Sequence, residues 1–199
     1  EKVLTFQKAV EGYDDIHETH PTSPKEEIRL TTECAFQRAL FNQGKTILKQ
    51  NESKEYCSWL DYELPVILNS NRRRQSLDLI GRDAKDVFWL CELKFYTKTC
   101  KSNSPYYAIA EISKYAWIVC KNQEQLDNKK VHHKGSSFFD FSWQEVANNF
   151  KIAVVCNKSY WIYWNKRLGV EHLNDISNKY GDILELFSGD DIDFKAQKN

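Results

Sequence analysis

The stretch from Ser76 to Tyr96, SLDLIGRDAKDVFWLCELKFY, decides how the rest of the chain is interpreted. Its pattern is typical of two short strands joined by a polar turn. Side chains alternate between the two faces of a strand, so Glu92 and Lys94 point the same way. If the two strands pair as a hairpin, Asp78 meets both residues across the ladder. Unpaired buried charge is costly, and a bound metal ion would explain two carboxylates on otherwise apolar strands.

Length and composition bound the class of protein. The 199 residues predict a single domain, 1–199, that is large enough for a real core. Lys plus Arg and Asp plus Glu both number 28, so any surface for nucleic acid must come from local clustering of charge. Eleven Phe, ten Tyr and six Trp favour a packed globule over disorder.

The expected compartment is the cytoplasm, without a membrane association. No apolar run approaches the roughly 20 residues of a membrane span. The first residues, EKVLTF, lack the basic-then-apolar layout of a signal peptide. The six cysteines are scattered and form no CxxC pair, which predicts reduced thiols in the core rather than disulfides.

Residues 24–50 are predicted to form the first helix. Ser23 suits the N-cap and Pro24 the first helical position. Apolar side chains then recur at near-helical spacing through the segment. Glu33 falls among these positions, so its carboxylate belongs to the helix.

A strand-rich segment and a second helix are predicted after the first helix, followed by a buried strand. The three strands cover 56–68, 76–81 and 86–97, the helix covers 105–119, and the buried strand covers 151–156. Outside this core we expect a polar loop over 121–137, a capped short helix over 142–150, a strand over 160–164 and a closing helix over 170–187. The core is expected to span residues 23–165.

This order of elements, together with Asp78 and the triplet from Glu92 to Lys94, resembles the PD-(D/E)xK nuclease superfamily. The resemblance covers residues 23–156, about two-thirds of the chain. It implies an α/β protein with a restriction-endonuclease-like αβββαβ core, a mixed central sheet flanked by helices, and an added C-terminal strand and helix. Leu77 stands where the family motif often has Pro, a position that varies widely. Members often carry polar or aromatic residues in the second helix, where this chain has Glu111, Lys114 and Tyr115.

The resemblance implies a metal-dependent nuclease, and the chemistry of phosphodiester cleavage agrees with it. Mg²⁺, or Mn²⁺ in its place, takes one or two carboxylates and keeps several waters. Asp78 and Glu92 would supply those carboxylates, and the Leu93 carbonyl could add a third oxygen. Lys94 would position or deprotonate the attacking water, or stabilise charge on the phosphate. Glu33 would hold a metal-bound water or a second ion.

The expected substrate is nucleic acid, with DNA favoured over RNA and endonuclease over exonuclease activity. Basic residues near the motif are expected to contact flanking phosphates, namely Arg72, Arg73, Arg74, Lys98 and Lys101. The chain contains no zinc finger or helix-turn-helix pattern. Specificity is therefore expected to come from a homodimer or from a separate partner.

Two other interpretations of the motif remain open. The three charged side chains could form a salt-bridge cluster on a solvent-facing sheet. Alternatively, a catalytically inactive restriction-like fold could serve only to bind nucleic acid or protein. The position of Glu33 relative to Asp78 and Glu92 separates these alternatives, because an enzyme needs the three carboxylates together.

Overall fold

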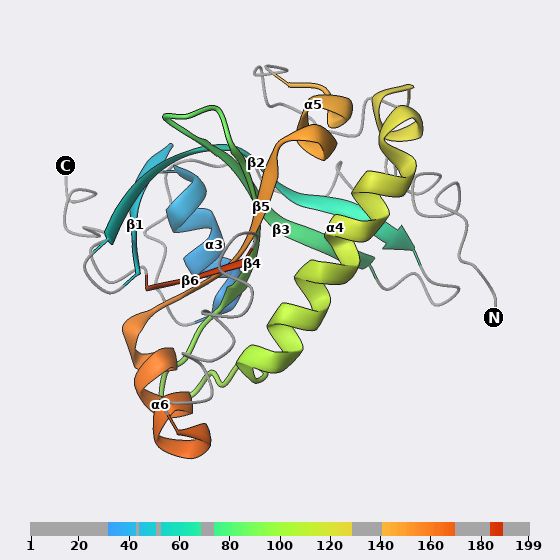
Figure 1. The fold of residues 1–199 in the computed structure, drawn as a ribbon. Helices are drawn as coiled ribbons and strands as arrows, with labels where there is room; N and C mark the ends of the chain where they lie inside the picture. The colour runs from blue at the N-terminus through green and yellow to red at the C-terminus, as the bar shows by residue number, and fades with distance from the viewer. Residues whose placement is uncertain are drawn as a thin grey trace.

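The computed structural model of the chain describes residues 32–42, 44–50, 53–68, 74–128, 141–169 and 184–188. Within them the order is one helix, four strands, two helices, a strand, a helix and a strand (Figure 1). The elements are α3 (Glu33–Asn42), β1 (Lys45–Gln50), β2 (Ser53–Leu68), β3 (Arg74–Asp83), β4 (Phe88–Lys94), α4 (Pro105–Asn128), α5 (Trp143–Asn148), β5 (Phe150–Cys156), α6 (Lys158–Leu168) and β6 (Leu184–Ser188).

The described strands form one mixed sheet in sequence order. Strands β1 to β4 are antiparallel to their neighbours, whereas β4 runs parallel to β5 and β5 runs parallel to β6. A single residue pair, Lys49 with Ser188, joins β1 to β6 and closes the curved sheet on itself. The α/β class and the mixed sheet are therefore confirmed.

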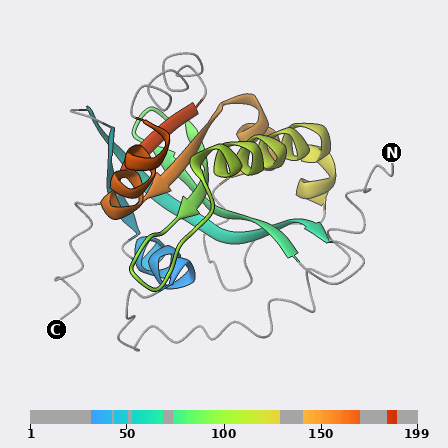
Figure 2. The ribbon, with the colours of Figure 1, turned by 90° about the horizontal axis from the view of Figure 1, so that it is seen from below.

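Helices cover the sheet from both sides (Figure 2). On one side α4, α5 and α6 pack on the sheet around a buried cluster that includes Leu90, Ile112 and Val154. On the other side α3 contributes Phe36 to a second cluster with Leu93. Every residue of β4 is buried, because this strand lies between the two clusters. None of the helices in the described ranges is long and apolar enough to cross a membrane.

The strand pair predicted around Asp78 is confirmed, since β3 and β4 are antiparallel neighbours. The capped short helix is also confirmed as α5. Ser142 accepts a hydrogen bond from the Glu145 amide, and the Glu145 carboxylate accepts one from the Ser142 amide. The buried strand over 151–156 is found as β5, parallel to β4.

The helix predicted over 24–50 is wrong in its last part. Helix α3 ends at Asn42, and Gly44 adopts a φ of 68°, a left-handed conformation that glycine allows. Residues 45–50 then pair with β2 as strand β1. Four strands therefore separate α3 from α4, one more than the expected αβββαβ order. Residues 24–31 lie outside the described part of the chain.

Three further predictions in the second half were wrong. Residues 121–128, predicted as loop, belong to α4 after a kink at Asn122, where φ is −129° and ψ is 16°, and Leu126 is buried in the cluster under that helix. Residues 129–137 of the predicted loop lie outside the described ranges. Residues 160–164 are helical in α6, with Tyr160 fully buried and Ile162 59% exposed, so the aromatic content misled the strand assignment. The closing helix predicted over 170–187 is contradicted at its end by β6, and residues 170–183 lie outside the described ranges.

Gly81 lies where β3 approaches β2 too closely for a side chain. A Cβ there would lie 2.3 Å from Cys57 Sγ and 3.0 Å from the Ser58 carbonyl oxygen. Gly81→Ala is expected to lower the free energy of unfolding by about 1–3 kcal/mol, because packed atoms must move. Thermal denaturation checks this against Gly44→Ala, which meets no atom within 4 Å and should lose only about 1 kcal/mol from its positive φ. A smaller loss at Gly81 than at Gly44 would contradict the close packing.

Candidate active site

The end of the β3–β4 ladder places Asp78 beside the charged residues of β4. The last pair of the ladder joins Leu79 to Cys91. Beyond this pair, the amide of Leu93, two residues after Cys91, donates a hydrogen bond at 2.7 Å to Oδ2 of Asp78, the residue before Leu79. The carboxylate thus takes the place of a backbone acceptor where the strands separate. On the other side of Asp78, its carbonyl accepts a hydrogen bond from Gln37 Nε2 of α3 at 2.7 Å.

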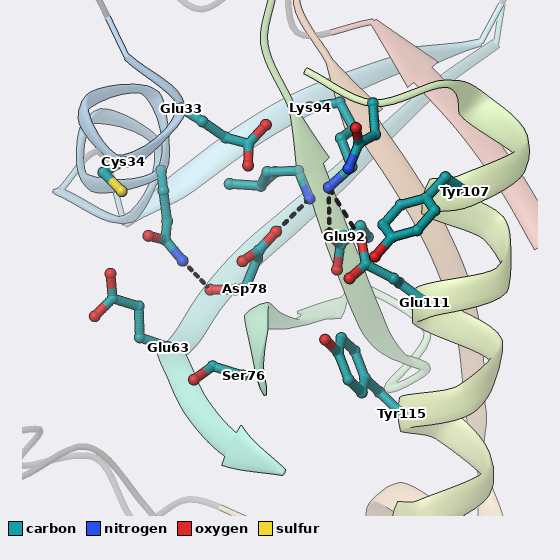
Figure 3. A pocket seen from close by; sticks show the side chains of 13 residues that line it. Glu33, Cys34, Glu63, Ser76, Asp78, Glu92, Lys94, Tyr107, Glu111 and Tyr115 are labelled. Atoms are coloured by element: carbon teal, nitrogen blue, oxygen red, sulfur yellow. Dashed lines mark hydrogen bonds and ion pairs between the residues drawn. The ribbon is translucent and has the colours of Figure 1, made fainter. Parts of the chain in front are cut away.

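These residues line a cavity of about 500 Å³ between α3 and α4. In Figure 3, Glu33 and Cys34 approach it from α3, and Tyr107 and Glu111 approach it from the opposite side on α4. The lining consists of Glu33, Cys34, Gln37, Glu63, Ser76, Asp78, Glu92, Leu93, Lys94, Asn103, Tyr107, Glu111 and Tyr115.

Lys94 is held between two carboxylates at the floor of the cavity. Its Nζ lies 2.5 Å from Glu92 Oε1 and 3.4 Å from Glu111 Oε2. Glu92 and Lys94 are each only 4% exposed. This burial contradicts the interpretation of the motif as a salt-bridge cluster on a solvent-facing sheet.

Glu33 reaches the same cavity from the first position of α3. Its Oε2 accepts a hydrogen bond from the Ser102 hydroxyl. That hydroxyl also accepts a hydrogen bond from the Phe95 amide at 2.9 Å, which ties the start of α3 to the residue that follows β4. The carboxylate is close enough to Asp78 and Lys94 to raise the pKa of both. Glu33 therefore shares the cavity with Asp78 and Glu92.

Burial dominates the electrostatics of the two central carboxyl groups. Loss of water raises the pKa of Asp78 to about 7, although the Lys94 ammonium and the Leu93 amide oppose the shift. Burial and the neighbouring Asp78 raise the pKa of Glu92 to about 9. Burial also disfavours charge on Lys94, but the surrounding carboxylates, Glu92 first among them, outweigh it and raise the pKa of Lys94. One ammonium thus faces more carboxyl groups than it can keep ionised.

A divalent cation fits this donor set. Glu92 Oε2 is buried and has no hydrogen-bond partner in the described structure. In a strand, the amide and the carbonyl of one residue point to the same side. The Leu93 amide points toward Asp78, so the Leu93 carbonyl also lies on the Asp78 side of β4. No three His, Cys, Asp or Glu side chains are grouped to hold a metal among the described residues. Two carboxylates and a carbonyl nevertheless suit Mg²⁺, which keeps several of its waters.

The structure brings together the five central residues of the prediction, whereas the basic residues that it describes do not line the cavity. Lys98 and Lys101 are exposed in the loop after β4 and do not line the cavity. Arg74 is the first residue of β3, and Arg72 and Arg73 lie outside the described ranges. The residues that the cavity gathers are Glu33, Asp78, Glu92, Leu93 and Lys94.

Other functional candidates were missed from the sequence. Gln37 follows Glu33 by one helical turn, a spacing that could have linked it to the site. Glu63 lines the cavity from β2 with a φ of 50°, a conformation rarely adopted by residues other than glycine. Neither Glu63 nor Ser102 is marked by any local motif, because both reach the site only through the curvature of the sheet and the path of a loop.

No family model, curated protein or solved structure matches this chain.

Proposed function

We propose that this protein is a Mg²⁺-dependent nuclease that hydrolyses phosphodiester bonds of nucleic acid, with DNA as the substrate. The observation that carries the proposal is the buried, unpartnered Glu92 Oε2, which shares a cavity with Asp78 and Lys94. A divalent cation would complete the coordination of that oxygen and balance the excess of carboxylates. The same cation would neutralise a phosphate that enters the cavity.

Each side chain of the site has a separate part in this reaction. Asp78 and Glu92 would hold the metal, which when bound supplies Lewis acidity and lowers the pKa of a bound water. Lys94, freed from Glu92 by the metal, would donate hydrogen bonds to the attacking water or to the phosphate oxygens. Glu111 lies 3.4 Å from the ammonium and would keep it in place. Glu33 would orient a water on the α3 side of the cavity.

The arrangement of elements supports a restriction-endonuclease-like core. A helix that carries Glu33 precedes the strands, the Asp78 strand is antiparallel to the strand of Glu92 and Lys94, and a long helix leads into the parallel strand β5. The additional strand β1 pairs at the edge of β2 and leaves the neighbours of the site strands unchanged.

Cleavage assays with Asp78→Asn test the proposal. Wild type is expected to convert supercoiled plasmid into nicked and linear forms with Mg²⁺ or Mn²⁺ but not with EDTA. Asp78→Asn should reduce the rate by more than about 100-fold, because the loss of even an outer-shell partner of a metal costs 10–100-fold. Linear duplex, single-stranded DNA and RNA establish the preferred substrate.

Asp86→Asn is the matched control, since this carboxylate lies in the exposed turn between β3 and β4, away from the cavity. It should cleave as wild type does. If wild type cuts none of the nucleic acids with either metal, the enzyme proposal is lost, and binding of nucleic acid without cleavage would favour the inactive binding module.

A further inference from the structure

A basic surface lies beside the candidate active site. It is made of exposed cations from α6 and from the loop 97–104, namely Lys98, Lys101, Lys158, Lys166 and Arg167. The segments 97–104 and 157–169 contain no Asp or Glu, although the whole chain has equal numbers of acidic and basic residues. We call these five residues the α6–loop surface.

The loop and the helix that carry this surface are joined firmly. Asn157 accepts a hydrogen bond from the Tyr96 amide at 3.0 Å and donates one to the Tyr96 carbonyl at 2.9 Å. The Tyr160 hydroxyl donates to the Asn103 carbonyl at 2.6 Å. The rings of Tyr96 and Tyr163 stack with their centroids 4.3 Å apart. The five cations are therefore presented by one rigid unit.

The topology places this unit at the edge of the sheet where the site lies. Strands β4 and β5 are parallel, so their carboxyl ends meet at one edge. Lys94 ends β4 and the loop follows it, while α6 begins two residues after β5 ends at Cys156. Figure 1 shows α6 beyond these strand ends, on the side from which α4 starts. The loop also lines the cavity through Asn103.

We propose that the α6–loop surface binds the sugar-phosphate backbone of the DNA that flanks the scissile bond. This inference rests on the proposed function, and charge complementarity to phosphate carries it. Lys158 and Lys166 are about 12 Å apart along α6 and about 80° apart around its axis, so both can contact one strand of a duplex over about three to four nucleotides. The guanidinium of Arg167 lies over the rings of Tyr163 and Trp164, 5.3 and 5.8 Å from their centroids. These two contacts hold the guanidinium against the last turns of α6.

The salt dependence of DNA binding tests this surface without any cleavage. The probe is a fluorescent 20-base-pair duplex, and binding is measured by anisotropy in EDTA over a range of salt concentrations. The variant is the double substitution Lys158→Gln, Lys166→Gln. The logarithm of the association constant falls with the logarithm of the salt concentration, and each lost phosphate contact reduces the steepness of this fall by about 0.9. For the double variant we therefore expect a slope less steep by about 1.8, and weaker binding than wild type.

The matched control is Lys85→Gln, Lys121→Gln, which also removes two positive charges at exposed positions. Lys85 lies in the turn before β4, at the opposite end of that strand, and Lys121 lies in the second half of α4. The control should keep the wild-type slope. Thermal denaturation of both variants verifies that they fold.

The possible results separate this inference from the proposed function. A slope unchanged by Lys158→Gln, Lys166→Gln, or an equal change in the control, overturns the α6–loop surface even if wild type cleaves DNA. A smaller slope in that variant alone supports the surface, and it does so even if wild type cleaves nothing, in which case only the nuclease proposal fails.

Discussion

Lys94→Met is expected to reduce the cleavage rate at saturating Mg²⁺ by about 10²- to 10³-fold, the loss typical for one donor aimed at developing charge. Lys94 is the only cation among the described residues that line the cavity. Methionine keeps the apolar stem but removes every hydrogen bond to water and phosphate. Mg²⁺ binding should persist or tighten, because the ammonium 2.5 Å from Glu92 competes with the metal for that carboxylate. Single-turnover cleavage and calorimetric Mg²⁺ titration measure the two effects separately.

Glu111→Gln is the comparison for this variant. It removes the more distant partner of Lys94, at 3.4 Å, and leaves the contact with Glu92. We expect a decrease in rate below about 10-fold, since an amide oxygen can still accept from the ammonium. If Lys94→Met cleaves at the wild-type rate, the lysine has no part in the reaction, and its burial serves only to neutralise Glu92.

The central part of the site could be predicted because its geometry is local. Glu92 and Lys94 are two residues apart on one strand, and alternation alone places them on one face. Asp78 joins them through a hairpin whose turn is short and polar. Glu33 was predicted only through the family resemblance, and its approach depends on the packing of Phe36 and neighbouring residues of α3 against the sheet. The position of Glu63 depends on the curvature of the sheet and that of Ser102 on the path of the loop after β4, and no short sequence pattern records either.

The errors in the fold have a common physical cause, which is that tertiary packing overrides local preference. Residues 45–50 have apolar spacing that fits a helix. However, the helix ends before Gly44, which has a positive φ, and all six residues pair with β2 instead. Residues 160–164 have the aromatic content of a strand. They form a helix because Tyr160 must reach the core while Ile162 faces solvent, a spacing that a strand cannot provide.

The free energy of unfolding of the metal-free protein is expected to fall as the pH rises from about 4 to 9. The folded pKa of Asp78 is about 7 and that of Glu92 is about 9, whereas both groups titrate near 4 in an unfolded chain. Between these values the folded protein binds more protons than the unfolded chain, so stability decreases with pH. The stabilisation is complete below about pH 4 and is lost as the pH passes through 7 toward 9. Lys94 does not contribute to this change, because its raised pKa leaves it protonated in both states over this range.

The double variant Asp78→Asn, Glu92→Gln isolates this effect from the other titrating groups. Without the two carboxyl groups, its free energy of unfolding should change less between pH 5 and pH 8 than that of metal-free wild type, which falls over this range. Mg²⁺ should raise the Tm of wild type more at pH 8 than at pH 5, where protons compete for the same oxygens, and should leave the double variant unchanged. Differential scanning calorimetry from pH 4 to 9 measures both. If wild type and the double variant lose stability in parallel, the two carboxylates ionise in the folded protein at no cost, and the electrostatic argument for a cation between them is wrong.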